Sequence, residues 1–135
     1  MVDEQEVQKK YLALQALGHQ MQQIQQQAEA LEQQADSLDE TLKSLDEIGT
    51  VKAGTEILVP IANGIFVKGH IQDTSTLLVN VGAHVNVPRS IPEVRKLIST
   101  QAVELRALQS QLAEQLQSMV AHAHKSEEEL QKLVE

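Results

Sequence analysis

A seven-residue repeat of apolar side chains runs through residues 4–48 and constrains the fold more than any other feature of the sequence. Its two positions hold Val7, Leu14, Met21, Ala28, Ala35 and Leu42, and Leu17, Ile24, Leu31, Leu38 and Leu45, with Lys10 as the one interruption. Apolar residues at this spacing line the face of a helix that packs against another helix. Gly49 follows where a helix is expected to end. We therefore predict one long helix over residues 4–48.

A second repeat of the same kind occupies residues 91–134. Ser90 and Glu93 have the spacing of a capping box, and Pro92 falls in the first turn, where its missing N–H is tolerated. The second repeat consists of Ile98, Ala102, Leu105, Gln109, Leu112, Leu116, Met119, Ala123, Ser126, Leu130 and Leu133. Together the two repeats form what we call the seam, and we predict a second long helix.

The two helices are about equally long, so they can fold back on each other as an antiparallel coiled coil. In a register where paired residue numbers add to about 140, Leu38 meets Ala102 and Ala28 meets Leu112. Large side chains then face small ones, which fills a core without voids. A parallel dimer of either helix would instead stack Ala on Ala, so we predict an intramolecular helical hairpin.

Between the helices, residues 55–88 alternate in the way typical of β-strands. Asn63-Gly64 predicts a tight turn, Gly82-Ala83 a second one, and a polar connection separates the two hairpins. Such short strands are not stable alone, and their open apolar edges would aggregate. We expect them to pair with hairpins of other subunits through Ile57, Val59, Ile61, Ile65, Val67, Leu77, Val79, Val81, Val85 and Val87.

The composition excludes several classes of function. A net charge of −8 argues against a nucleic-acid surface, and no apolar run reaches the length that spans a bilayer. The chain has no Cys, no phosphate-binding glycine loop and no H-E-x-x-H motif, and His122 and His124 point to different sides of a helix. We therefore expect a soluble cytoplasmic protein that is not an enzyme and holds no metal or cofactor.

The segment "LVPIANGIFVKGHIQDTSTLLVNVGAHVNVPRS" (58–90) resembles the archaeal-type prefoldin alpha subunits, and the resemblance covers the whole chain. Leu58-Val59-Pro60, Phe66-Val67-Lys68, Asp73-Thr74 and the run 79–83 carry it, and two hairpins select the alpha type over the one-hairpin beta type. His84 departs from the family, which usually has Gly there, and Pro88 is unusual in a strand.

The resemblance implies an α+β fold in which residues 1–135 form one prefoldin-like domain. Two alpha and four beta-type subunits would form a hexamer with a double β-barrel body and six coiled-coil tentacles. Such a complex is an ATP-independent co-chaperone that holds unfolded proteins and passes them to a group II chaperonin.

Apolar residues outside the seam gather near the free end of the predicted coiled coil, and the seam weakens there. Lys10 faces Leu130 and Leu14 faces Ser126, so polar groups enter the core and the last turns should fray. Non-native chains share exposed apolar surface, so we predict that this end, the tip, binds them. The predicted tip residues are Val2, Val7, Tyr11, Leu12, Leu14, Val120, Leu130, Leu133 and Val134.

Three alternatives remain open from the sequence. Apolar residues at the helix ends could simply cover the partner helix, since single surface leucines are common. The strand edges could pair into filaments instead of a closed hexamer. A coiled-coil adaptor for one folded partner is the third alternative, although it should carry a continuous apolar stripe along one helix face.

Overall fold

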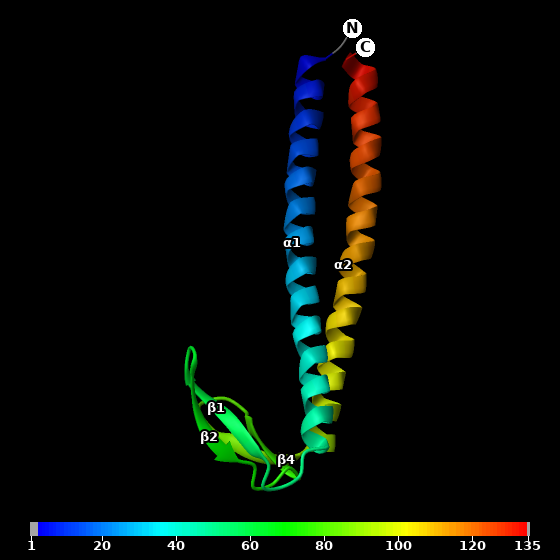
Figure 1. Cartoon of the computed structure of the whole chain (residues 1–135). Coiled ribbons are helices and arrows are strands. Elements are labelled where there is room, and N and C mark those ends of the chain that lie inside the picture. The colour runs from blue at the N-terminus through cyan, green and yellow to red at the C-terminus, as the bar shows by residue number, and fades with distance from the viewer. Residues whose placement is uncertain (1–2, 135) are drawn as a thin grey trace. The chain divides into compact units, whose positions relative to one another are not determined.

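The computed structural model describes residues 3–134, and the predicted order of elements is confirmed (Figure 1). Two long helices and two small antiparallel strand pairs make up an α+β fold. Helix α1 spans Glu4–Gly49 and α2 spans Ile91–Val134; the strands are β1 (Glu56–Ala62), β2 (Ile65–His70), β3 (Thr76–Asn80) and β4 (Asn86–Ser90).

The chain divides into two compact units, each of which contains a part of both helices. One unit consists of Met1–Ala35 and Val103–Glu135, and the other of Asp36–Ala102. The assignment of residues 1–135 to a single domain stays a prediction.

In the first unit, α1 and α2 pack as the antiparallel pair that the repeat predicts. Every seam residue of this unit is buried or half-buried, including Ile24 and Ala35, which are its best-buried side chains on α1. Lys10 Nζ lies 3.5 Å from Glu129 Oε2, which joins residues whose numbers add to about 140. The seam and its register are therefore confirmed here.

Within the second unit, the helix segments also pack in an antiparallel pair. Leu45 and Ala102 are buried, and the guanidinium of Arg95 pairs with the Asp46 carboxylate, again in the predicted register. Val94 lies outside the predicted seam, yet it is only 8% exposed. The buried face of α2 therefore shifts by one residue in its first turns, where Ile91, Val94 and Ile98 are buried or half-buried. The Ser90 hydroxyl accepts the N–H of Glu93 and confirms the helix cap.

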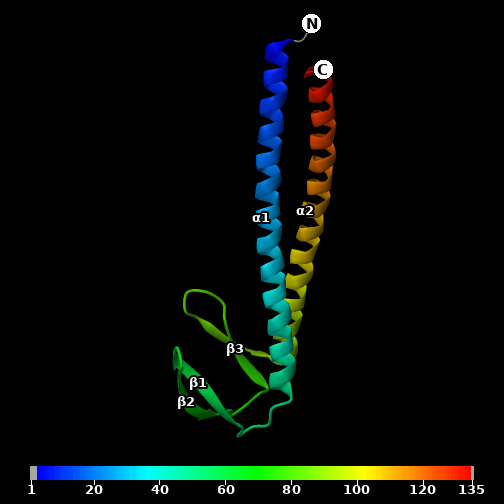
Figure 2. The ribbon, with the colours of Figure 1, turned by 45° about the horizontal axis from the view of Figure 1, so that its top comes forward.

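The strands form two separate two-stranded sheets (Figure 2). In the first, Val59 pairs with Val67, and a bulge interrupts the register between Pro60 and Ala62. In the second, Val79 pairs with Val87, and Pro88 takes its place opposite Leu78. Both strands of a two-stranded sheet are edge strands, which is where a proline is accommodated.

The turn between β3 and β4 is longer than the predicted Gly82-Ala83 pair. Gly82, Ala83 and His84 all have positive φ, of 111°, 50° and 62°. The Asn80 side chain accepts the N–H of Gly82, and the N–H of Val85 donates to the Gly82 carbonyl. Two successive non-glycine residues in the left-handed region carry strain, which the bonds of the turn hold in place.

Candidate functional site

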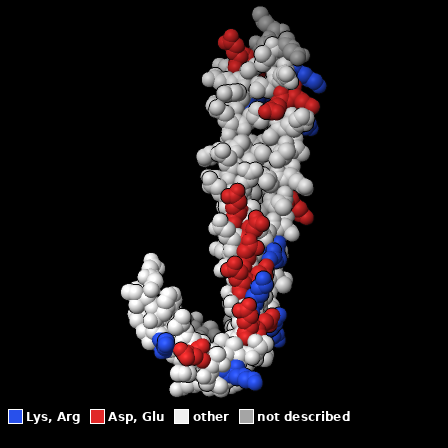
Figure 3. All heavy atoms as spheres, viewed as in Figure 1, with Lys and Arg blue, Asp and Glu red and all other residues white. Residues whose placement is uncertain are grey.

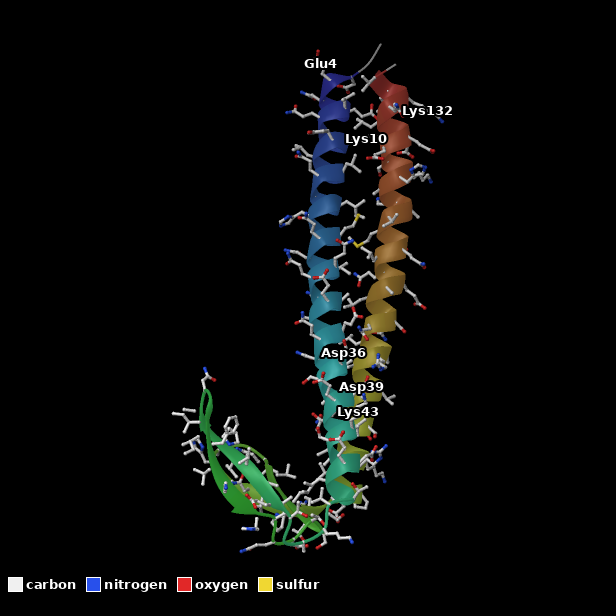
Figure 4. All side chains as sticks on the ribbon, in the orientation of Figure 1. Glu4, Lys10, Asp36, Asp39, Lys43 and Lys132 are labelled. Atoms are coloured by element: carbon white, nitrogen blue, oxygen red, sulfur yellow. The ribbon has the colours of Figure 1, made fainter. Side chains whose placement is uncertain are left out.

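The tip of the first unit is the end at which α1 begins and α2 finishes. Figure 4 labels Glu4 and Lys132, which lie on the first and last turns that meet there. Asp3 caps α1, because its carboxylate accepts the N–H of Gln5 at 3.0 Å. This cap marks where α1 starts, and the apolar seam sets which of its side chains face α2.

An open, mostly apolar groove of about 650 Å³ lies between the two helices at the tip. Four of the predicted tip residues line it, Val7 and Tyr11 from α1 and Leu130 and Val134 from α2, together with Glu4 and Gln8. The structure thus brings together side chains that are more than a hundred positions apart in the sequence. Tyr11 is 52% exposed and Val134 66% exposed, so the groove offers apolar surface to the solvent.

The other predicted tip residues lie outside this groove. Leu12 is 55% exposed and borders a smaller hollow with Gln5, Gln8 and Lys9. Val120 is exposed on α2, and Leu14 and Leu133 are half-buried in the seam. Val2 lies outside the described residues.

The packing between the helices is weaker just behind the groove. Lys10 occupies a seam position with 35% of its side chain exposed, and Figure 4 shows it on the side of α1 that faces α2. One further step along, a hollow of about 240 Å³ lies beside Leu17 and Ser126. A small polar side chain in a core layer leaves its neighbours without contacts. A layer predicted to be weak therefore borders a hollow, although a larger one of about 730 Å³ lies farther from the tip, beside Ala28 and Gln109.

A second candidate surface lies on the β1–β2 hairpin, which exposes apolar side chains on both faces. One face carries the predicted residues Ile57, Val59, Ile65 and Val67, and Ile61 lies at the bulge; all five are exposed. On the view in Figure 3 this hairpin bears few charged side chains. Neither face of this two-stranded sheet is buried within the chain. Exposed apolar faces of this kind are normally covered by another protein segment, so we expect a partner on each face.

The β3–β4 hairpin is apolar on one side and better covered. Leu77, Val79 and Val87 are half-buried, whereas Val81 and Val85 at the turn are exposed. Leu78, on the opposite face, is 73% exposed.

Three exposed apolar strand residues, Leu58, Phe66 and Leu78, are absent from the predicted assembly set. The prediction took only one face of each alternating strand. These three residues could have been predicted from the sequence. They are apolar and lie between the predicted residues of the same strands, and a strand that is apolar at successive positions is typically covered on both faces.

Nothing among residues 3–134 gathers into a metal-binding group of His, Cys, Asp or Glu. The hydroxyl and the backbone N–H of Ser75 both donate to Asp73 Oδ1 and lower the pKa of this carboxyl, which lies in the connection between the hairpins. This arrangement is a local turn. In the same described range, no helix has an apolar stretch long enough to cross a bilayer.

Comparison with known proteins points to one family. The Prefoldin family pattern, described as "Prefoldin subunit", matches residues 17–135. Prefoldin subunit alpha of Thermofilum pendens is 29% identical over 80 residues, which cover 59% of this chain and 62% of that protein's length. Prefoldin subunit alpha of Archaeoglobus fulgidus is 25% identical over 130 residues, covering 96% of this chain and 95% of the relative.

A solved structure shares the fold. The cryo-EM structure of filamentous PFD from Methanocaldococcus jannaschii superposes with a TM-score of 0.73 at 19% identity, covering 84% of this chain and 93% of that one. The chain has two hairpins between its two helices, and the relatives named above are both alpha subunits. The two observations agree on the alpha type. The chain belongs to the prefoldin family of chaperone subunits, as an archaeal-type alpha subunit, and is not an enzyme.

Proposed function

We propose that this chain is the alpha subunit of an ATP-independent co-chaperone that holds unfolded proteins at its coiled-coil tips and delivers them to a group II chaperonin. The observation that carries the proposal is the open apolar groove at the tip, lined by Val7, Tyr11, Leu130 and Val134. The proposed place of work is the cytoplasm.

The groove suits a client that is recognised by exposed apolar side chains and not by sequence. Its volume of about 650 Å³ falls within the range of small-molecule pockets, so one or two large side chains of a client fit. Its lining is mostly apolar, and Glu4 and Gln8 supply its charged and amide groups, too few to select one ligand by sequence. The predicted tip residues are therefore proposed as the client site, with the groove residues as its centre.

The same proposal gives the hairpins the role of assembly. Prefoldin subunits assemble with one another, and the exposed strands of β1–β2 have the unpaired edges and apolar faces that such assembly covers. The specific partners proposed are four beta-type subunits for every two alpha subunits, joined into a β-barrel body.

Filament formation is the second candidate. The solved neighbour is a filamentous prefoldin, and the strand edges of this chain are open to a partner that does not close a ring. An adaptor role has less support. Val103 and Leu108, exposed apolar residues of α2, lie 12 or more residues from Val120, the nearest exposed tip residue, and form no continuous stripe with it.

The first experiment is the native mass of the chain alone and after mixing with a one-hairpin beta-type prefoldin subunit. A small species that becomes a discrete hexamer with the partner supports the co-chaperone proposal. A long polydisperse polymer that is indifferent to the partner supports the filament instead and contradicts the hexamer.

The tip is tested separately with a polar triple variant, Tyr11→Ser, Leu12→Ser and Val134→Ser. The matched control replaces three apolar side chains that are similarly exposed elsewhere on α2, at Leu97, Val103 and Leu108. Both variants should assemble like the wild type. We expect aggregation of an unfolded client, followed by light scattering, to resume with the tip variant only. Equal protection by both variants would contradict the tip site.

A further inference from the structure

Gly69 is the next-to-last residue of β2, at a paired position where the hairpin itself does not need a glycine. It pairs with Ile57 across the sheet, and it is not among the glycines with positive φ. A Cβ built on Gly69 would meet Val59 Cγ2 at 3.6 Å and Ile57 Cγ1 at 3.9 Å, which are ordinary van der Waals contacts. An alanine would therefore fit without strain and add apolar contact.

A glycine at a paired position of a strand destabilises the strand relative to alanine, so its presence there needs a physical reason. It loses more conformational freedom on folding than alanine does, and it offers no side chain to the sheet. By contrast, Gly64 and Gly82 occupy turns with φ of 78° and 111°, which a side chain would strain. Residues 3–134 give no comparable reason for Gly69, and a partner that approaches the backbone of β2 would supply one.

The surroundings of Gly69 show which face such a partner covers. Directly paired residues share a face, so Gly69 lies with Ile57, Val59 and Val67 on the Val59 face, where these three side chains are exposed. Its neighbours along the strand, Lys68 and His70, project to the other face. The other face is mixed at this level, since Leu58, which is 61% exposed, pairs with Lys68. The Val59 face carries Ile57, Val59 and Val67, and Gly69 forms a gap among these apolar side chains.

We propose that Gly69 is a contact point for assembly, at which a large apolar side chain from the hairpin of a beta-type subunit seats against the backbone of β2. The inference rests on the proposed function, which supplies this partner. A gap bordered by Ile57, Val59 and Val67 complements a branched side chain, because large residues facing small ones fill an interface without voids. The gap is also continuous with the surface proposed for assembly.

The test compares Gly69→Ala with His70→Ala, a control on the same strand whose side chain projects to the other face. Each variant is mixed with the one-hairpin beta-type subunit, and the association is followed by native mass over a dilution series. We expect Gly69→Ala to weaken association about tenfold, because an added methyl overpacks the contact, and Gly69→Val to weaken it further. His70→Ala should associate like the wild type.

Hydrogen exchange of residues 56–70 in the unmixed chain separates assembly from folding. Gly69→Ala should keep or increase the protection of the cross-strand amides, since alanine suits the strand better. Loss of this protection would overturn the inference, because the glycine would then serve the hairpin itself. Unchanged association of both Gly69 variants would overturn it too, while leaving the assembly proposal intact. A wild-type chain that fails to join the beta-type subunit refutes the proposed function first.

Discussion

Replacing Lys10 by leucine should close the tip, and this change tests the weak layer of the seam most directly. Lys10 occupies a core position between the helices, where its ammonium group pairs with Glu129 at 3.5 Å. Only 35% of the side chain is exposed, so about two-thirds of a leucine placed there would be buried against α2.

The expected gain follows from these values. Full burial of a leucine stabilises by about 1.5–3 kcal/mol, so two-thirds of it contributes about 1–2 kcal/mol. The stem of Lys10 already buries part of this apolar area, and the exposed ion pair with Glu129 contributes at most about 1 kcal/mol. The net stabilisation of the tip is therefore about 1 kcal/mol, which lowers its opening constant about fivefold.

Hydrogen exchange of residues 4–17 measures this opening in the intact chain. We expect Lys10→Leu to slow exchange there about fivefold, in line with the estimate above. The matched control is Lys9→Leu, which makes the same chemical change at an exposed position outside the seam and should leave exchange nearly unchanged. If clients bind to an opened tip, Lys10→Leu should also protect an unfolded client less well.

Two results would refute the reasoning. If Lys9→Leu slowed hydrogen exchange at the tip as much as Lys10→Leu does, the effect would come from the lost charge or the added apolar residue and not from packing in the seam. Faster exchange in Lys10→Leu would show that the ion pair with Glu129 holds the tip together better than an apolar layer does.

Three further predictions concern single residues. A Cβ at Gly18 meets nothing within 4 Å, so Gly18→Ala should stabilise α1 by about 1 kcal/mol and raise the melting temperature, whereas the reverse change at exposed Ala30 should lower it. His84→Gly should relieve a φ of 62° and stabilise the β3–β4 turn by about 0.5 kcal/mol, while His84→Val should destabilise it, as measured by amide exchange in that turn. The lowered pKa of Asp73 means that its contribution to the connection is present above the pKa of an unfolded aspartate and is lost as the pH falls through the folded value. Ser75→Ala should move the NMR titration of Asp73 upward, and an unmoved midpoint would contradict the hydrogen bonds as its cause.

The helices were predictable almost residue by residue, because burial in a coiled coil repeats with the sequence. Polar residues such as Lys10, Gln109 and Ser126 were assigned to the seam by position alone, and all three are half-buried. The predicted seam of α2 begins at Ile98 and leaves out Val94, which the structure buries in the first turn of the helix.

The candidate sites were only partly predictable. The tip residues of α1 and α2 could be brought together from the register, so the groove of Val7, Tyr11, Leu130 and Val134 follows from the seam. The exposed apolar residues on the second face of the hairpins were not predicted. The alternating pattern of a strand indicates which side chains share a face, but it does not indicate whether partners cover one face or both. The positive φ of Ala83 could not be read from the sequence, since alanine does not require it. For His84 the glycine that is usual in the family at this position was the available sign of a positive φ.

The antiparallel register also determines when each layer of the seam is able to close during translation. Asp46 and Arg95 are separated by 49 positions, whereas Lys10 and Glu129 are separated by 119. At about 5–20 residues per second, a ribosome makes Glu129 about 6–24 seconds after Lys10. The helix pair therefore zips from the strands outward, and the tip turns of α1, made early, are the last to find their partner.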